Sequence, residues 1–337
     1  MVTSYPPTHC GIAAYSEQAV NHLRSQGHVV DVLSPDGQGN VDFAWDLRGG
    51  WNVLKLRKLF PYYDKIVLQY VWSFYYRDPF SLAGRIDTLK TTLSFIGLFL
   101  ISRKIEIVAH EIPYMTGRSN WLYRLKWKLA PKLVLHTGKE RERLEQHYHM
   151  RLKDSRVELR EHHGAFRKFS GHSQASARRE LGVVSDACIF LCIGFIQRHK
   201  GFDRAIRAFQ QANLPNAMLY VVGSMRVKDE ENQEYLAELY ELAKGRPNVK
   251  IVESFVSNEE FDSWIAAADW VIFPYSGIWS SGVMARTRLL DRPAIVACVG
   301  GLPDQAGERD LLFHDDAELL DALHHAAAVY ANAQVRR

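Results

Sequence analysis

The stretch Leu191–Phe209 reads LCIGFIQRHKGFDRAIRAF and decides the fold. An apolar run of strand length ends at Gly194, a short loop carries Arg198 and Lys200, and Gly201 opens an amphipathic helix. Glycine permits a close approach of the backbone, and the N-terminus of a helix attracts anions. Two cations at this position suit a diphosphate; the alternative is that both are merely solvated. The stretch predicts a strand–loop–helix unit with a diphosphate site in its loop.

Strand-like and helix-like segments alternate along the whole chain, which predicts an α/β fold with doubly wound, mostly parallel sheets. At 337 residues the chain exceeds what one hydrophobic core usually serves. We therefore expect two domains, residues 1–165 and 178–337, joined by a linker over 166–177 that is rich in Gly, Ser and Gln. Such sheets bind ligands at the carboxyl ends of their strands, so we expect the site in loops after strands, in a cleft between two facing domains.

The composition is that of a soluble globular protein, with 47% hydrophobic and 24% charged residues. The four cysteines show no zinc-binding spacing, which favours buried thiols in a reducing cytosol. The sequence predicts no signal peptide, and the longest apolar run, Leu93–Ile101, is too short to span a bilayer. We expect a cytoplasmic protein that is not integral to the membrane.

Charge is unevenly distributed along the chain. Residues 1–165 hold 23 Lys and Arg against 16 Asp and Glu, whereas residues 166–337 hold 19 against 22. A basic half suggests an anionic partner, and residues 118–131 (RSNWLYRLKWKLAP) predict a basic amphipathic helix of the interfacial kind. The alternative is a core-facing helix with a solvated basic back. Because no nucleic-acid-binding module is recognisable, we expect peripheral contact with the inner face of the cytoplasmic membrane. The expected apolar face comprises Trp121, Leu122, Leu125 and Leu129, with Arg124, Lys126 and Lys128 off it.

Three further loops carry groups that could contact a ligand. The stretch TSYPPTHCGIAAY places Gly11 after a first strand and at a helix start, where an anion can bind. In IVAHEIPY a strand ends at His110, which can orient a hydroxyl or share a proton near neutral pH, or merely cap the loop. The hydroxyls of Ser280 and Ser281 stand at another helix start, where they can cap the helix and contact a ligand.

Taken together, these stretches resemble the retaining glycosyltransferases of family 4, which have the two-domain GT-B fold. The resemblance runs from Val2 to about Ala331 and is carried by the order and spacing of GHVVDVLSP, AHE, HHG at 162–164, GFIQRHKGFDRAIRAF, VESFVSNEEFDSWIAAADWVIFPY and RPAIVACVGGLPD. It implies a C-terminal domain that binds a nucleoside-diphosphate sugar and an N-terminal domain that holds a saccharide or lipid-linked acceptor. It implies no metal and no cofactor, because basic residues neutralise the leaving diphosphate.

The resemblance also implies roles for individual residues. Lys200 matches the lysine of the family's KG motif and should contact the diphosphate. Phe195 stands where the family usually has an arginine, and Arg198 can substitute for it. The implied site comprises catalytic His110, Arg198 and Lys200; donor-binding Gly11, Gly194, Phe255, Val256, Ser280, Ser281, Gly282 and Arg286; and, on the acceptor side, Tyr5, His9, Glu111 and Tyr114.

The stretch SSGVMARTRLLDRPAIV, which starts at residue 280, departs from the family pattern. The family usually has one glutamate near its start, which contacts the transferred sugar, and a second on the helix, which binds the ribose. Here neither carboxylate exists, and Arg286 stands at the second position. An arginine there can grip ribose oxygens, a phosphate or an acidic sugar, or it can pair with Asp291 or Asp304.

We therefore expect a hexosyltransferase-type enzyme that moves a sugar with retention, in the synthesis of a bacterial surface polysaccharide or glycolipid. The missing carboxylates leave two alternatives open. The first is a weakly active or non-catalytic sugar-nucleotide-binding protein of the same fold. The second, less favoured, is a sugar-nucleotide 2-epimerase, which would need acid and base groups that include carboxylates in the cleft.

Overall fold

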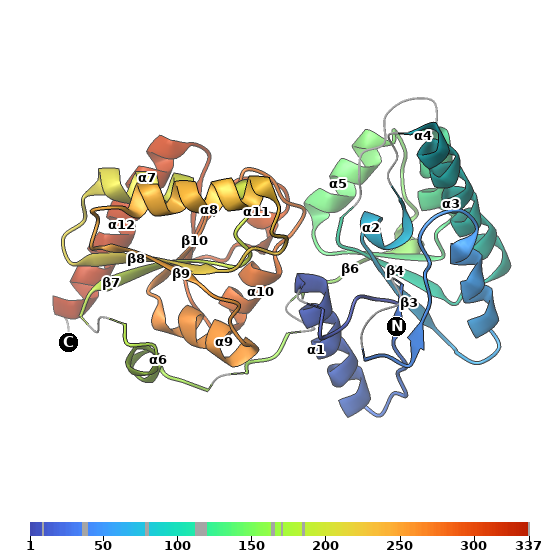
Figure 1. The fold of residues 1–337 in the computed structure, drawn as a ribbon, viewed down its shortest axis with the longest axis horizontal. Helices are drawn as coiled ribbons and strands as arrows, with labels where there is room; N and C mark the ends of the chain where they lie inside the picture. Colours follow the sequence, from blue (N-terminus) through green and yellow to red (C-terminus); the bar gives the residue numbers. More distant parts are fainter. Residues whose placement is uncertain are drawn as a thin grey trace. The chain divides into compact units, whose positions relative to one another are not determined.

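Two parallel β-sheets, one in each half of the chain, organise the computed structural model (Figure 1). They belong to two compact units, Met1–Ala165 and Phe166–Arg337. The predicted α/β fold with doubly wound parallel sheets is confirmed. The structure describes residues 1–8, 10–35, 40–77, 81–111, 120–162, 166–169, 171–183 and 186–335.

The sheet of the first unit is wound in two directions from its first segment. Val2 forms parallel bridges to Leu33 on one side and to Leu68 on the other. The described strands therefore lie in the order β2, β1, Val2, β3, β4, β5, β6, and the winding reverses between Val2 and β3. The strands are β1 (Leu33–Ser34), β2 (Phe43–Ala44), β3 (Ile66–Tyr70), β4 (Ile105–Ala109), β5 (Lys132–Leu135) and β6 (Val157–Leu159).

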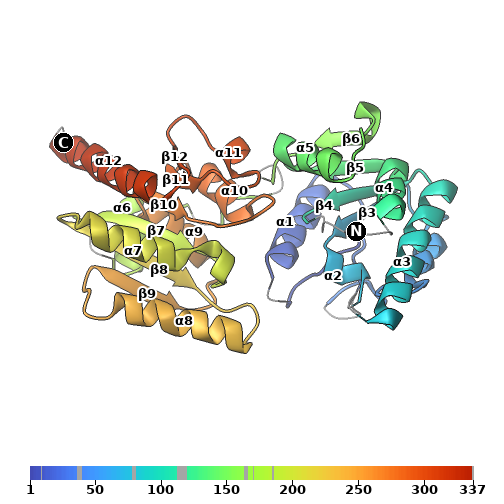
Figure 2. The same ribbon diagram turned by 90° about the horizontal axis from the view of Figure 1, so that it is seen from above.

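Helices of the first unit begin at polar caps that the sequence supplies. The Ser81 side chain accepts a hydrogen bond from Gly84 N at the start of α3, and Thr137 and Glu140 form a capping box at α5. Helices α3 and α4 pack side by side (Figure 2). The helices are α1 (Gly11–Ser25), η1 (Asn52–Leu59), α2 (Trp72–Tyr75), α3 (Leu82–Ile101), α4 (Asn120–Leu129), α5 (Gly138–His147) and η2 (Asp154–Arg156).

Helix α4 does not have the apolar face expected within residues 118–131. Leu122 is buried while Trp121 is exposed, so the two do not share one surface. Lys126, expected on the solvated side, is 1% exposed, and its Nζ donates to the Tyr70 hydroxyl at 2.9 Å. Packing of α4 against α3 explains the difference, because it turns the lysine into the aromatic core. The first two residues of the stretch lie outside the described residues, and no described helix is long and apolar enough to cross a bilayer.

The second unit has a six-stranded parallel sheet in the order β12, β11, β10, β7, β8, β9. Its four inner strands, β11, β10, β7 and β8, are apolar and almost wholly buried, as expected for a parallel sheet with helices on both faces. The chain winds outward from β7 through β8 and β9, then returns to the other side of β7 with β10. The strands are β7 (Cys188–Ile193), β8 (Ala217–Gly223), β9 (Val249–Glu253), β10 (Trp270–Phe273), β11 (Ala294–Ala297) and β12 (Leu311–Phe313).

Helices cover both faces of this second sheet. In Figure 1, α7, α8 and α12 lie on one face, and α9 and α10 lie on the other. Helix α7 turns a fully buried row that includes Phe202, Ile206 and Phe209 toward the core. The helices are α6 (Gln174–Glu180), η4 (Arg198–Lys200), α7 (Phe202–Ala212), α8 (Glu230–Ala243), α9 (Asn258–Ala267), α10 (Gly282–Leu289), α11 (Leu302–Gln305) and α12 (Asp316–Val335).

The segment expected as a linker is partly helical. Residues 174–177 form the start of α6, which Ser173 caps by accepting a hydrogen bond from Ser176 N. Helix α6 packs against α9, and Arg178 forms a buried ion pair with Asp269, with 2.6 Å between Nη2 and Oδ2. The small polar residues that suggested a linker thus include Ser173, the cap of α6. The ion pair between Arg178 and Asp269 joins residues far apart in the sequence, so the local pattern does not predict it.

Candidate functional site

The loops after β7 and β10 meet at the carboxyl edge of the second sheet. These two strands are neighbours, yet the chain proceeds to β8 on one side and to β11 on the other. Doubly wound sheets bind ligands at such a switch point. Gly201 has a φ of 63° and approaches Pro274 so closely that a Cβ would lie 2.2 Å from its carbonyl oxygen. Glycine is therefore needed for the two loops to come together.

Lys200 lies at this junction, at the end of η4. Its Nζ is 4.0 Å from the ring centroid of Tyr275, which is on the loop after β10. Burial lowers the pKa of Lys200 to about 7. A bound anion would favour the charged ammonium and raise that pKa. The structure thus places the predicted lysine where the fold provides a ligand site.

Arg198 lies in the same loop but interacts with a different part of the unit. Its side chain is exposed, and Nη1 donates to Glu238 Oε2 on α8 at 3.0 Å. The guanidinium also lies over the ring of Tyr235, 4.8 Å from the centroid. Contact between Arg198 and a diphosphate therefore requires the side chain to leave Glu238, and this role stays a prediction.

The N-terminus of α10 carries the predicted serines. Ser281 is buried and caps the helix, accepting a hydrogen bond from Met284 N at 3.2 Å. Its own backbone is held by Gln305, whose Oε1 accepts from Ser281 N at 2.7 Å. The Ser280 hydroxyl oxygen is buried and has no hydrogen-bond partner among the residues that the structure describes. Gly282 is the first residue of the helix, so two hydroxyls and the backbone N–H groups of the first turn stand at one helix start.

Arg286 is buried within the second unit rather than free for a ligand. Nε donates to Asp262 Oδ1 at 3.0 Å, and Nη2 donates to the Asn258 carbonyl oxygen at 2.7 Å. Nη1 donates to the Asn258 side-chain oxygen at 3.1 Å. The structure therefore shows an ion pair, with Asp262 on α9 as the partner instead of Asp291 or Asp304. We do not retain Arg286 as a donor-binding residue, because each guanidinium nitrogen already has a partner.

Arg288 also has a structural partner. Its Nη1 donates to Asp310 Oδ2 at 3.3 Å. The Asp310 carboxylate is buried and accepts backbone N–H groups of Ala294 and Gly307. The two arginines of α10 thus connect this helix to Asp262 on α9 and to Asp310 just before β12. Neither has the acceptor chemistry of the glutamates that the family usually has here.

The remaining donor-side residues lie on loops along the same sheet edge. Gly194 ends β7, and a Cβ on Gly223 at the end of β8 would be 1.8 Å from the Gly194 carbonyl oxygen. Ser254 N donates to the Gly223 carbonyl at 2.9 Å, which brings the loop after β9 alongside. Phe255 in that loop is 54% exposed, and Val256 is half-buried.

A large cavity lies at the opposite edge of this sheet. Its volume is about 1040 Å³, and its walls include Cys188 and Asn216 at the amino ends of β7 and β8. Arg178 in its wall is bound to Asp269 and to two carbonyl oxygens. We place the candidate site at the carboxyl edge instead, because the fold directs its loops and helix N-termini there.

In the first unit, the predicted residues occupy the corresponding edge. Gly11 is exposed at the start of α1, where Cys10 Sγ accepts from Ala13 N. Tyr5 is half-buried, and Glu111 Oε1 accepts from Trp72 N at 3.0 Å and so caps α2. The structure therefore gives Glu111 a local structural role. The predicted acceptor-side residues His9 and Tyr114 lie outside the described residues.

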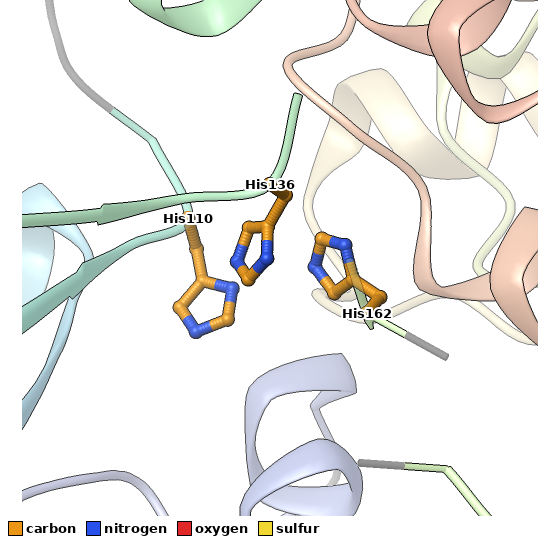
Figure 3. A group of neighbouring side chains, drawn as sticks. All are labelled: His110, His136 and His162. Atoms are coloured by element: carbon orange, nitrogen blue, oxygen red, sulfur yellow. The ribbon is translucent and has the colours of Figure 1, made fainter. Parts of the chain in front are cut away.

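His110 belongs to a group of three histidines. It follows β4, His136 follows β5, and His162 lies just beyond β6; Figure 3 shows His136 between the other two. The ring centroids of His136 and His162 are 3.5 Å apart, and those of His110 and His136 are 5.0 Å apart. Burial lowers the pKa of all three, that of His136 to about 4. The imidazoles are therefore neutral at pH 7 and can offer nitrogen lone pairs.

Sequence reasoning missed His136, His162 and Tyr275 as members of these sites. The signal that could have found the histidines is their position, since each stands at or just after the carboxyl end of a strand. Tyr275 likewise follows β10 by two residues. Their convergence depends on the strand order, which no local pattern supplies.

Comparison with known proteins places the second unit in a family. Residues 187–328 match the family model described as "Glycosyl transferases group 1". A D-inositol 3-phosphate glycosyltransferase from Nocardioides is 32% identical over 171 residues, which are 46% of this chain and 37% of that relative. The match thus spans little more than a third of the relative's length.

Solved structures resemble nearly the whole chain. Sucrose-phosphate synthase from Thermosynechococcus elongatus aligns with a TM-score of 0.67 and 16% identity, over 95% of this chain and 84% of that one. Anabaena HepE in complex with UDP-glucose aligns with a TM-score of 0.58 and 17% identity, over 94% and 83%. A Rickettsia africae glycosyltransferase aligns with a TM-score of 0.68 and 12% identity, over 97% and 87%. At these identities the likeness establishes the fold, which is that of the GT-B glycosyltransferases. The chain thus has the GT-B fold, and its residues 187–328 match the family of the group 1 glycosyltransferases.

Proposed function

We propose that the chain transfers a sugar from a nucleoside-diphosphate donor to a saccharide or lipid-linked acceptor, with retention of the anomeric configuration. The observation that carries this proposal is Lys200 at the switch point of the unit that matches the family model, beside Tyr275 on the loop that leads from β10 to α10. HepE, a structural neighbour, has been solved in complex with UDP-glucose, which supports a nucleotide sugar as the donor class.

In this proposal, protein groups rather than a metal neutralise the leaving diphosphate. The Lys200 ammonium would stabilise the negative charge that develops on the leaving oxygen, and the N-terminus of α10 would add backbone N–H groups. Ser280 offers a buried hydroxyl without a partner among the described residues. His110 would position or polarise the reacting sugar. We assign no protein nucleophile, and we place the reaction in the synthesis of a bacterial surface polysaccharide or glycolipid.

The competing function is binding of a sugar nucleotide without transfer. It is favoured by Arg286, which stands where the family usually has a ribose-binding glutamate and is engaged by Asp262. No carboxylate at that position is available to the ribose. An epimerase is the less favoured alternative, because the same carboxylates are missing from the second unit.

Turnover separates transfer from binding. We expect purified protein to release a nucleoside diphosphate from at least one UDP-, GDP- or ADP-sugar, and we expect Lys200→Ala to lower the rate by about 10²–10³-fold, as loss of one oxyanion-stabilising group does. Lys244→Ala, on an exposed lysine paired with Glu241, is the matched control and should be unaffected. If the wild type binds donors yet is as inert as Lys200→Ala, the binding-only function is correct.

We further propose that the first unit touches an anionic membrane surface, chiefly through α3 rather than residues 118–131 alone. Apolar side chains at helical spacing are exposed along α3, and basic side chains flank them on α3 and α4. This combination suits a peripheral enzyme with a lipid-linked acceptor. The exposed apolar residues are Leu82, Ile86, Leu89, Leu93 and Leu100, and the exposed basic ones are Arg85, Lys90, Arg124 and Lys128.

A further inference from the structure

Three histidines converge at the carboxyl edge of the first unit's sheet, from three different strands. One ring nitrogen from each of His110, His136 and His162 lies within 4.8 Å of the others. His136 and His162 are 3% and 6% exposed, and His110 is half-buried. The Tyr15 ring packs against them edge-on, with centroids 5.1 Å from His110 and 5.6 Å from His162. Two of the three rings are thus buried, and Figure 3 shows the three grouped together.

The hydrogen bonds fix which nitrogen of His136 carries the proton. Its Nδ1 lies 2.8 Å from the Arg160 carbonyl oxygen. A carbonyl oxygen can only accept, so Nδ1 carries the hydrogen, and in the neutral ring Nε2 keeps its lone pair. That Nε2 is buried and has no partner among the residues that the structure describes. A buried acceptor without a donor lowers the stability of the folded state, and a hydrogen-bond donor or a metal ion that binds the Nε2 lone pair would remove that cost.

His110 follows the same logic on the opposite side of the cluster. Its Nε2 lies 2.6 Å from Gln69 Oε1, while the Gln69 amide nitrogen faces Met1 Sδ at 3.6 Å. Gln69 therefore accepts from His110 Nε2–H, which leaves the Nδ1 lone pair free. The third ring, His162, has a buried Nδ1 that also lacks a partner in the described part of the chain.

This pattern is the one by which proteins hold metal-binding histidines. A ligating imidazole usually donates its other N–H to a backbone carbonyl or a side-chain oxygen, which fixes the tautomer and the ring orientation. Arg160 O and Gln69 Oε1 occupy those positions for His136 and His110. Neutral imidazole suits Zn²⁺ and its neighbours among the divalent transition metals, and three histidines leave the fourth position of a tetrahedral site open.

We propose that His110, His136 and His162 bind one divalent transition-metal cation, with Zn²⁺ the best-suited ion. Three nitrogens that lie within 4.8 Å of one another leave a point within about 2.8 Å of each, so a nitrogen has to move inward by at most roughly 0.7 Å to reach a Zn–N distance of about 2.1 Å. The open position would accept an oxygen ligand, from water or from a substrate hydroxyl. This site is separate from the diphosphate site assigned to Lys200, and the proposal does not rest on sugar transfer.

Metal titration of the untagged full chain tests the proposal. Protein stripped with a chelator and dialysed is titrated with Co²⁺, whose visible absorption reports the coordination geometry, and then with Zn²⁺ in competition. We expect one equivalent of each metal per chain, tetrahedral Co²⁺ bands, and a rise in melting temperature with Zn²⁺. Two outcomes would overturn the proposal. One is stoichiometric binding by the double variant His136→Ala with His162→Ala, and the other is wild-type protein that binds neither Co²⁺ nor Zn²⁺ in the titration.

Graded variants separate ligands from their supports. His136→Ala or His162→Ala should weaken binding by more than about 100-fold. Gln69→Ala removes the oxygen that orients His110, together with the amide nitrogen that faces Met1 Sδ, and should weaken binding by about 10–100-fold. The control is His324→Ala on α12, an exposed histidine of the second unit, which should bind as the wild type does. Circular dichroism checks folding, and Gln69→Ala keeps the test decisive if a histidine variant does not fold. An unchanged affinity in folded Gln69→Ala protein contradicts the assignment of His110 as a ligand.

Discussion

Lys200 is the residue on which the proposed donor site depends, and the effect of burial on its pKa predicts a specific pH dependence. The pKa of the free side chain is about 7, and a bound diphosphate raises it. Binding is therefore strongest below pH 7 and weakens as the pH rises through the free and toward the bound pKa. We expect the dissociation constant for the bound nucleoside diphosphate to increase by up to about tenfold per pH unit between pH 7 and 9.

The same range of pH avoids titration of the ligand, because the second ionisation of a terminal phosphate is complete above about pH 7. Lys200→Arg is the matched control, since a guanidinium stays charged throughout. Calorimetric titrations at several pH values should give a rising dissociation constant for the wild type and a flat one for Lys200→Arg. A flat wild-type profile would show that Lys200 does not meet the diphosphate.

Arg286 is a residue whose role the structure reassigns from ligand binding to stability. Removing one member of a buried ion pair leaves the other charge uncompensated, at a cost of about 3–5 kcal/mol. We expect Arg286→Ala to lower the free energy of unfolding by roughly that amount in urea titrations. Asp262→Ala should cost more, because Asp262 also accepts from Phe169 N at 2.7 Å. If Arg286→Ala unfolds like the wild type but no longer binds nucleotide, Arg286 is a donor ligand after all.

At the scale of the element, α3 and α4 show how packing alters what a sequence pattern suggests. The basic and aromatic pattern of residues 118–131 predicted an interfacial helix, but packing against α3 buries Lys126 and Leu122. Meanwhile α3, whose last turns form the longest apolar run, exposes an apolar face. The spacing of apolar residues shows that a helix has an apolar face. Whether that face is buried or exposed depends on how the neighbouring helix packs against it.

Introducing negative charge into the apolar stripe of α3 tests the proposed membrane surface. Leu89 and Leu93 are exposed one turn apart, so Leu89→Glu with Leu93→Glu places two carboxylates in the stripe without disturbing the core. We expect this variant to lose most of its binding to vesicles rich in phosphatidylglycerol in a flotation assay, and wild-type binding to fall in high salt. Val329→Glu on α12, also at an exposed apolar position, should bind as the wild type does. Equal flotation of all three proteins would rule out α3 as the contact.

At the scale of the whole molecule, neighbouring residues in the sequence predict the helices, the strands and the positions of the loops. Which side chains meet at a site depends on contacts between residues that are far apart in the sequence. The strand end at Gly194, the η4 cations and the Ser281 cap are each predictable from adjacent residues. The loop after β7 carries Lys200, so a prediction of this strand–loop–helix unit also predicts the position of Lys200 near the switch point. The partner of Arg286 lies 24 residues away and is one carboxylate among many. The histidine cluster needs three strands in the right order, so no single stretch reveals it.

The two units contribute differently to the account. The family model covers much of the second unit, and the donor site proposed there is built from its own loops. The family model does not extend into the first unit, and the acceptor role predicted there stays a prediction. The most direct test therefore addresses the second unit, where the family match, the sheet topology and the half-buried Lys200 support the same proposed ligand.

That test is calorimetric titration of UDP, GDP and ADP into wild-type, Lys200→Ala and Lys244→Ala protein at pH 7. Hydrogen bonds to charged groups contribute about 1.5–3 kcal/mol, so we predict that at least one nucleotide binds the wild type and Lys244→Ala equally and binds Lys200→Ala roughly 10- to 150-fold more weakly. Equal affinity in all three proteins, or no binding of any nucleoside diphosphate to the wild type, would contradict the assignment of the donor site.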